Sequence, residues 1–204
     1  MAKAAEETER AMWDALAALD PRSVCERAAV EFDPGARRYT CASFGQSIRL
    51  DLDGRAFRGG TPIAEKLLGR LGYFAKLSML DYLLHARAIP ESGRLVAPSE
   101  LSAAQLYFRG SHVLPCDRLA AAFDADPARF AAVGRDLGGE PQPYGDVAVR
   151  VRPLPRIPVV VVLWRGDEEF GPRSGILFDA SVSDQLAPDV VWSIAMVSIL
   201  IFMA

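Results

Sequence analysis

The sequence contains few of the residues that build metal or redox centres. Among its 204 residues are only three cysteines, Cys25, Cys41 and Cys116, and two histidines, His85 and His112. Structural zinc and iron–sulfur sites need several thiolate or imidazole ligands at short spacing, and the cysteines are far apart. An odd number of cysteines is also atypical of a secreted disulfide framework. We therefore expect reduced thiols, no intrinsic cofactor and a cytoplasmic location.

Signatures of common enzyme classes are also missing. No GxGxxG, Walker, HExxH or GxSxG pattern occurs. The net charge of −3 argues against nucleic-acid binding, because contacts to phosphates require a basic surface. The apolar run at residues 190–204 is shorter than the roughly 20 residues of a membrane span, so we expect a core helix or a terminal tail there, buried in the protein's own core or docked on a partner. Residues 1–19 are acidic, and we expect no signal peptide.

The composition that is present is typical of a globular protein. Half of the residues are hydrophobic and 24% are charged. Helical and alternating patterns predict an α+β fold: small antiparallel sheets packed with helices, an N-terminal helix and a C-terminal apolar helix. We expect one domain over 1–204, divided into an N-terminal helix and meander (about 1–60), a helical middle (about 61–139), and a C-terminal strand hairpin and helix (about 146–204).

The most apolar run of β-forming residues predicts a central strand. Residues 159–164, VVVVLW, have no polar position, so we expect a strand buried on both faces. A polar loop at 165–173 and a return strand at 176–178 would complete a hairpin. The meander at residues 30–57 contains the dipeptide Asp53-Gly54, which is typical of a type I′ turn. The meander either forms its own sheet or joins the C-terminal strands.

Three segments together indicate a family. The longest is PLPRIPVVVVLWRGDEEFGPRSGILFDASVSDQLAPDVVW at residues 153–192, accompanied by LYFRGSHVLP at 106–115 and GGEPQPYGDVAVRV at 138–151. In these segments, and in the order of its elements, the chain resembles the bacterial and archaeal family called domain of unknown function 3786. Gly171 departs from the family pattern, which has a proline after the Glu-Phe pair, and a glycine there loosens the loop slightly.

The resemblance implies a metabolic context for the protein rather than a biochemical activity. Members of the family occur largely in anaerobes, and some resemble fusions to iron–sulfur domains found in corrinoid proteins of one-carbon metabolism. This chain lacks the cysteine-rich segment of such fusions. An iron–sulfur or corrinoid group would therefore belong to a partner protein.

The acidic loop after the apolar strand is the first candidate site. Asp167, Glu168 and Glu169 follow the strand that ends at Trp164, and Asp179 ends the return strand. Carboxylates grouped around a concave surface bind Mg²⁺ or Ca²⁺, or act as acid and base when burial separates their pKa values.

A plainer interpretation of this loop is a solvated hairpin. Arg165 and Arg173 lie on either side of the acidic residues and would serve as ion-pair partners. Structural ion pairs are commoner than functional sites, so this interpretation stays open beside the first.

The second candidate site is the segment at residues 107–112, YFRGSH. Arg109 would bind a carboxylate or phosphate, His112 would act as a base or ligand, and Tyr107 would provide an aromatic contact. A structural loop with His112 bonded to backbone is the alternative. His85 lies in the leucine-rich helix, where we expect a surface or boundary residue.

Three functional hypotheses follow. In the first, the chain is an accessory or ligand-binding protein that uses Arg109, His112 and the loop from Trp164 to Glu169. In the second, it is a metal-assisted hydrolase or transferase, with the carboxylates at 167, 168 and 179 on the metal and His112 as base. In the third, it is a structural interaction domain with an exposed apolar patch, involving the C-terminal helix.

Overall fold

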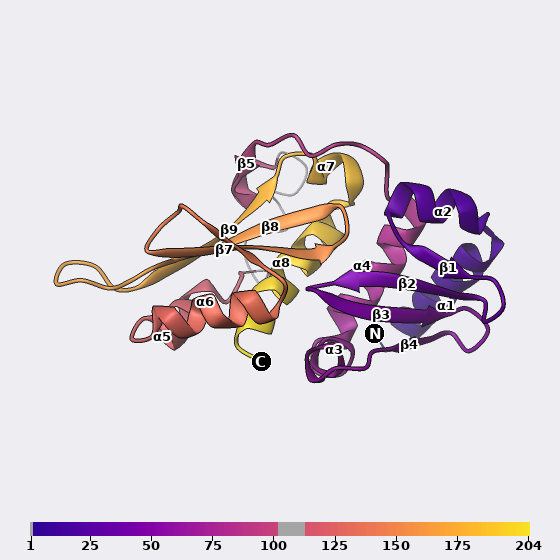
Figure 1. Ribbon diagram of the computed structural model, residues 1–204, viewed down its shortest axis with the longest axis horizontal. Coiled ribbons are helices and arrows are strands. Elements are labelled where there is room, and N and C mark those ends of the chain that lie inside the picture. Colours follow the sequence, from indigo (N-terminus) through magenta and orange to yellow (C-terminus); the bar gives the residue numbers. More distant parts are fainter. Residues whose placement is uncertain (1, 102–112) are drawn as a thin grey trace.

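The structure is a computed structural model, and it describes residues 2–101 and 113–204, with side chains from residue 6 onward in the first range. Two halves lie side by side (Figure 1), each with its own antiparallel sheet and its own helices. The predicted α+β class is therefore confirmed. The meander forms its own four-stranded sheet and does not join the C-terminal strands.

The first half runs through α4. Its elements are α1 (Ala2–Ala18), α2 (Pro21–Ala28), β1 (Glu31–Asp33), β2 (Arg38–Ser43), β3 (Gln46–Asp51), β4 (Ala56–Arg58), α3 (Pro62–Leu68) and α4 (Gly72–His85). Two of the helices begin where the sequence places a cap before a proline. The side chain of Asp20 accepts from the N–H of Ser23 at 3.1 Å, and that of Thr61 accepts from Ala64 at 3.1 Å.

One turn of the meander differs from its prediction. The loop between β3 and β4 spans four residues, and its positive φ is at Arg55 rather than at Gly54. A type I′ turn needs positive φ at both central positions, so the predicted turn at Asp53-Gly54 is wrong. Instead, the carboxylate of Asp51 accepts from the N–H of Gly54 at 2.7 Å and shapes a longer loop.

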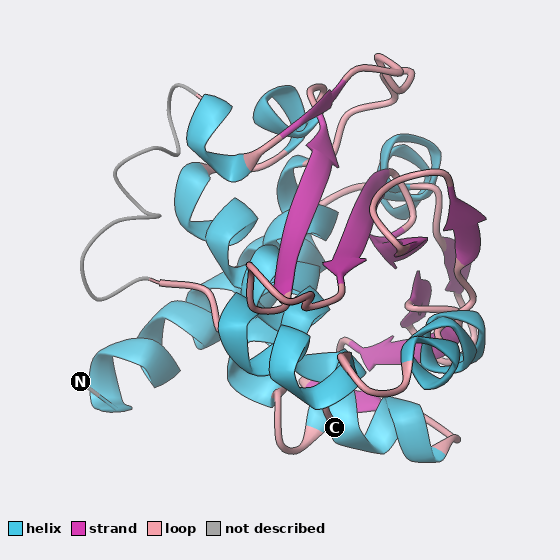
Figure 2. Ribbon diagram, turned by 90° about the vertical axis from the view of Figure 1, so that its left-hand side faces the viewer, coloured by secondary structure: helices cyan, strands magenta, loops and turns pink. Residues whose placement is uncertain are grey.

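The second half contains a five-stranded sheet in the order β5-β9-β8-β7-β6. Its elements are β5 (Leu95–Val96), a 3-10 turn (Pro98–Glu100), α5 (Cys116–Phe123), α6 (Pro127–Asp136), β6 (Glu140–Gln142), β7 (Val147–Leu154), β8 (Ile157–Trp164), β9 (Arg173–Asp179), α7 (Val182–Gln185) and α8 (Pro188–Phe202). Helices α5, α6 and α8 pack against the sheet (Figure 2).

The strand β8 is central and buried on both faces, as predicted. Val159, Val161 and Leu163 belong to the main core, whereas Val160 and Val162 lie in a smaller cluster on the other face. The alternation of a strand places successive side chains on opposite faces, so a strand that is covered on both sides needs apolar residues throughout.

The C-terminal helix α8 lies inside the protein's own core. Ile194, Val197 and Ile201 are each at most 4% exposed, and the helix packs against both α4 and the sheet. The sequence predicted a core helix or a terminal tail here and left its packing partner open, and the structure has the helix in the protein's own core. Among the described residues, no helix combines the length and the apolar character needed to cross a membrane.

Buried polar contacts join the two halves. The hydroxyl of Tyr82 in α4 donates to the carbonyl oxygen of Ala28 at 2.8 Å and accepts from the N–H of Arg156 in the β7–β8 turn at 3.1 Å. The guanidinium of Arg156 also donates to the carbonyl oxygen of Arg27 at 2.8 Å. These bonds tie the ends of α2 and α4 to the second sheet.

Candidate functional site

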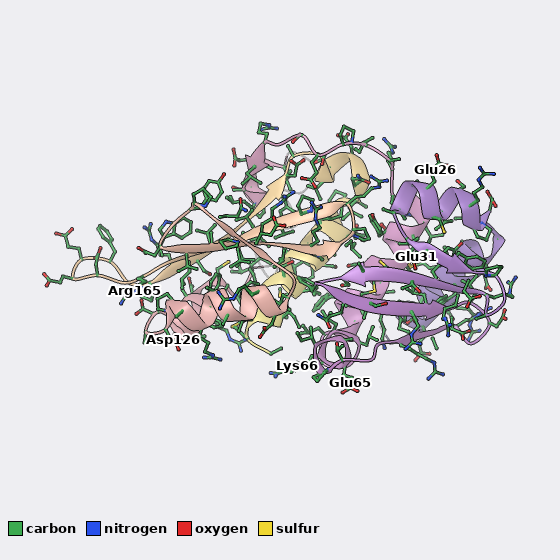
Figure 3. The ribbon with its side chains drawn as sticks, in the orientation of Figure 1. Glu26, Glu31, Glu65, Lys66, Asp126 and Arg165 are labelled. Atoms are coloured by element: carbon green, nitrogen blue, oxygen red, sulfur yellow. The ribbon has the colours of Figure 1, made fainter. Side chains whose placement is uncertain are left out.

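The acidic loop forms the projecting end of the β8–β9 hairpin, at the far left of Figure 1. Arg165 lies at the base of this loop, close to the start of α6 (Figure 3). Its N–H donates to the carboxylate of Asp146 at 2.8 Å, and its Nε donates to the carbonyl oxygen of Asp124 at 3.3 Å. The side chain of Arg165 therefore anchors the loop to the end of α5.

Asp167 organises the tip of the loop. Its Oδ1 accepts from the N–H of Glu169 at 2.8 Å and from the N–H of Phe170 at 2.7 Å. These two bonds lower the pKa of the Asp167 carboxyl below its ordinary value. This is an Asx turn, in which a short acidic side chain closes the backbone on itself. Glu168 and Glu169 are exposed beside it.

Asp179 lies at the other end of the hairpin and, unlike Asp167, is buried. It is 3% exposed, and its carboxylate accepts from the N–H and the hydroxyl of Ser92, the N–H of Gly93 and the N–H of Ser181. Burial raises its pKa, but the bonds from Ser181 and Ser92 outweigh this effect and lower the pKa to about 2. Asp179 is thus a buried carboxylate that orders the 92–94 loop.

The carboxylates therefore do not gather into one metal site. In the strand register, Arg173 pairs with Trp164 at the loop end and Phe178 pairs with Val159 at the other. This separation corresponds to roughly 16 Å of strand. Among the described residues, no cluster of three acidic, histidine or cysteine side chains is suited to hold a metal ion. The geometry does not support the shared site predicted for positions 167, 168 and 179.

The other predicted candidates are placed as follows. Trp164 is half-buried at the end of β8, with the guanidinium of Arg173 5.9 Å from the centre of its ring. Tyr107, Arg109 and His112 lie outside the described residues. The three cysteines are unpaired, and burial raises the pKa of the Cys41 thiol to about 12, so this thiol stays protonated.

A cleft of 340 Å³ lies between α1, α4 and α8. Apolar side chains from all three helices line it, namely Met12, Phe74, Leu77, Val190 and Trp192. The polar lining consists of Thr8, Tyr73, Ser78, Asp81, Asp189 and Ser193. Concave sites of this size and mixed character are typical of small-molecule binding. None of the predicted loop residues, from Trp164 to Glu169, lines this cleft.

Two residues that line the cleft each have a buried polar atom without a hydrogen-bond partner among the described residues. Within the described part of the chain, no group bonds to the hydroxyl of Ser78 or to Oδ2 of Asp81, although both atoms are shielded from solvent. Ser78 is 1% exposed, and the side chain of Asp81 is 16% exposed. A buried polar atom left unpaired costs about 1–3 kcal/mol, so these two lining residues have unused capacity for hydrogen bonds.

The environment of Asp81 weakens its ionised form. Burial raises the pKa of this carboxyl, the neighbouring His85 lowers it, and the charge of Asp189 on α8 raises it. His85 is exposed and does not line the cleft, but its Nδ1 lies 3.1 Å from Oδ1 of Asp81. The predicted surface position of His85 is confirmed, but the residue also contacts a carboxyl of the cleft.

One wall of the cleft is aromatic. The rings of Phe74 and Trp192 meet edge to face with centroids 5.4 Å apart, and the ring of Tyr73 lies 5.3 Å from that of Phe74. Tyr73 is 65% exposed, which is unusual for a large side chain. Three aromatic side chains therefore contribute to the lining of the cleft.

Sequence reasoning did not identify this cleft. A signal was present in the leucine-rich helix, because Ser78, Asp81 and His85 follow one another at spacings of three and four, which places them on one helical face. Polar residues on such a face, within a helix that is otherwise apolar, suggest a solvent-exposed or functional surface. The contributions of α1 and α8 depend on tertiary packing and leave no local pattern.

Comparisons with known proteins identify a family but no activity. Neither the curated proteins nor the solved structures include a significant match to this chain. The family model described as Domain of unknown function (DUF3786) matches residues 20–200, which is most of the sequence and includes the hairpin, α4 and most of α8. The chain therefore belongs to the DUF3786 family.

Proposed function

We propose that this chain is a small-molecule-binding protein whose ligand occupies the cleft between α1, α4 and α8. The observation that supports this proposal is a pair of buried polar atoms, on Ser78 and Asp81, that have no hydrogen-bond partner among the described residues and belong to residues lining a largely apolar cleft. A ligand that donates hydrogen bonds would satisfy both atoms after small side-chain rotations, because a hydroxyl and a carboxyl turn easily about their last bond.

The test is a fragment screen on the full chain by ligand-observed NMR. Wild type is compared with Ser78→Ala and Asp81→Asn, and with Asp136→Asn as a matched control on an exposed aspartate of α6 that does not line the cleft. Hits that lose about ten-fold in affinity in the two cleft variants and keep it in the control support the proposal. Hits unaffected by either cleft variant, or no hits, reject it.

A second candidate function is partner recognition through the hairpin loop. Phe170 is 62% exposed in the projecting loop, next to the acidic side chains of Glu168 and Glu169. An exposed aromatic residue on a protruding loop is a typical anchor of protein interfaces. This loop would fit an apolar pocket with a basic rim.

The family resemblance suggests what that partner is. In this proposal the chain is a cytoplasmic accessory protein of anaerobic metabolism, and the loop docks on an iron–sulfur or corrinoid protein. The test is co-purification from anaerobic cells with absorption spectra of the eluate, comparing wild type with Phe170→Ser. Loss of a cofactor spectrum in the variant supports the proposal, whereas an eluate without such a spectrum, or an unchanged one, rejects it.

A further inference from the structure

The charge of the cleft lining is negative. Among the described lining residues, Asp81 and Asp189 are carboxylates, and no lysine or arginine is present. An anionic ligand would meet two like charges, and the described lining residues offer hydroxyl groups but no positive charge to offset them. The lining therefore disfavours carboxylates and phosphates and favours a positively charged group.

The aromatic wall has the same preference. The faces of Tyr73, Phe74 and Trp192 carry partial negative charge, which attracts ammonium groups placed within about 6 Å of the ring centre. Aromatic rings combined with a carboxylate recur in sites for organic cations, because the rings replace part of the hydration shell that the cation gives up.

Other positively charged ligands fit less well. A bare metal ion needs several oxygen or nitrogen ligands at short range, and no cluster of three such side chains occurs among the described residues. The cleft volume of 340 Å³ is far larger than an ion and is mostly lined by carbon. It suits a small organic body attached to a charged nitrogen.

We infer that the cleft takes an organic ammonium compound, with the charged nitrogen at Asp81 and Ser78 and the apolar body against Phe74 and Trp192. This inference rests on the proposed function. After small rotations of the two side chains, the ammonium N–H groups would donate to Oδ2 of Asp81 and to the hydroxyl oxygen of Ser78, the two atoms that lack partners within the described residues. Asp189 adds long-range attraction from the rim.

The experiment compares three probes that share one benzyl group. These are 2-phenylethylamine, 2-phenylethanol and phenylacetate, which are positive, neutral and negative at neutral pH. Affinities of the full chain are measured by calorimetry at low salt. We expect the amine to bind about ten-fold more tightly than the alcohol, because a hydrogen bond to a charged group is stronger than a neutral one. The acid should bind most weakly.

Variants separate the claim that the ligand binds in the cleft from the claim that the cleft prefers a cation. Asp81→Asn should abolish the preference for the amine over the alcohol, whereas Ser78→Ala should weaken both probes by a similar factor. Asp136→Asn should change neither. Equal affinities of amine and alcohol in wild type, or tighter binding of phenylacetate, overturn the cation inference and leave a ligand site. If none of the three probes binds while the wider fragment screen gives cleft-dependent hits, the cation inference is also rejected and the proposed function survives.

Discussion

The Nδ1 atom of His85 lies 3.1 Å from Oδ1 of Asp81, one turn earlier on α4. This contact engages one oxygen of the carboxyl, and Oδ2 has no partner within the described residues. Burial raises the pKa of Asp81, His85 lowers it, and Asp189 on α8 raises it. His85 is therefore the group that favours the ionised, ligand-ready form of Asp81.

Replacing His85 by alanine should raise the pKa of Asp81 further. Burial and the charge of Asp189 then act without the opposing contact. Because a bound cation favours the ionised carboxyl, affinity for 2-phenylethylamine increases as pH rises through this pKa, and the midpoint of that increase should move to higher pH in His85→Ala. The measurement is carbon-13 NMR titration of the Asp81 carboxyl, together with the pH profile of binding.

His85→Gln is the matched variant, because glutamine can donate a hydrogen bond but carries no charge. His85→Gln should therefore raise the pKa of Asp81 less than His85→Ala does. An Asp81 titration that is the same in all three proteins would contradict the role assigned to His85.

The hairpin and the cleft differ in how far sequence could predict them. The run from Val159 to Leu163 has no polar position, and only a strand covered on both faces accommodates such a run, so β8 was predictable. The role of Asp179 was not predictable, because its partners Ser92 and Gly93 lie more than 80 positions away. A carboxylate at a strand end has the same local sequence context whether it binds a metal or caps a loop.

The cleft shows a second limit of sequence reasoning. Helix α4 is buried around much of its circumference, with Leu80 and Tyr82 both fully buried although they point in different directions. A helix that is surrounded by others does not show a single apolar stripe, so the helical spacing of Ser78, Asp81 and His85 was only a weak signal of the cleft. Which helices meet there is decided by tertiary packing.

Asp179→Asn should destabilise the protein and remove part of its acid sensitivity. The folded-state pKa of about 2 lies below the ordinary value of 3.8, so this group stabilises the fold fully above about pH 4. The contribution is lost as pH falls toward 2, and it amounts to about 2 kcal/mol. Urea denaturation at pH 7 and pH 2.5 should therefore show a large difference between wild type and variant only at pH 7.

Glu168→Gln is the control for that comparison, because Glu168 is exposed at the tip of the hairpin. Its unfolding free energy should stay within about 0.5 kcal/mol of wild type at both pH values. A difference for Asp179→Asn that is as large at pH 2.5 as at pH 7 would show that the loss is steric rather than electrostatic.

Tyr82→Phe should weaken the junction between the two halves. The hydroxyl of Tyr82 is buried and bonds to both Ala28 and Arg156, so its removal leaves a carbonyl and an N–H without their partner. We expect a loss of about 1–3 kcal/mol in the free energy of unfolding. Tyr144→Phe, at a tyrosine that is 41% exposed, should have little effect. Equal losses in the two variants would mean that the junction contributes nothing specific.

The backbone approach between Gly45 and Gly138 predicts a graded glycine series. Gly138 has a φ of +69°, and a Cβ there would lie 2.9 Å from the Cα of Gly45. Gly93 has a φ of +73° with open space around it, and Gly171 has open space without a positive φ. Gly171→Ala should change the free energy of unfolding by less than about 0.5 kcal/mol. Gly93→Ala should lower it by roughly 1 kcal/mol, because there the added methyl group strains only the backbone conformation.

Gly138→Ala should cost more than Gly93→Ala, because the added methyl group also separates the two backbones. Each half of the protein supplies one of these glycines, so the loss measures how closely the halves must approach. Urea denaturation of the three variants gives the comparison. A loss at 138 no larger than that at 93 would show that the halves can move apart without cost, and the α4–α8 cleft would then lack a fixed width. A larger loss supports a rigid junction, which is what a preformed ligand site between α1, α4 and α8 requires.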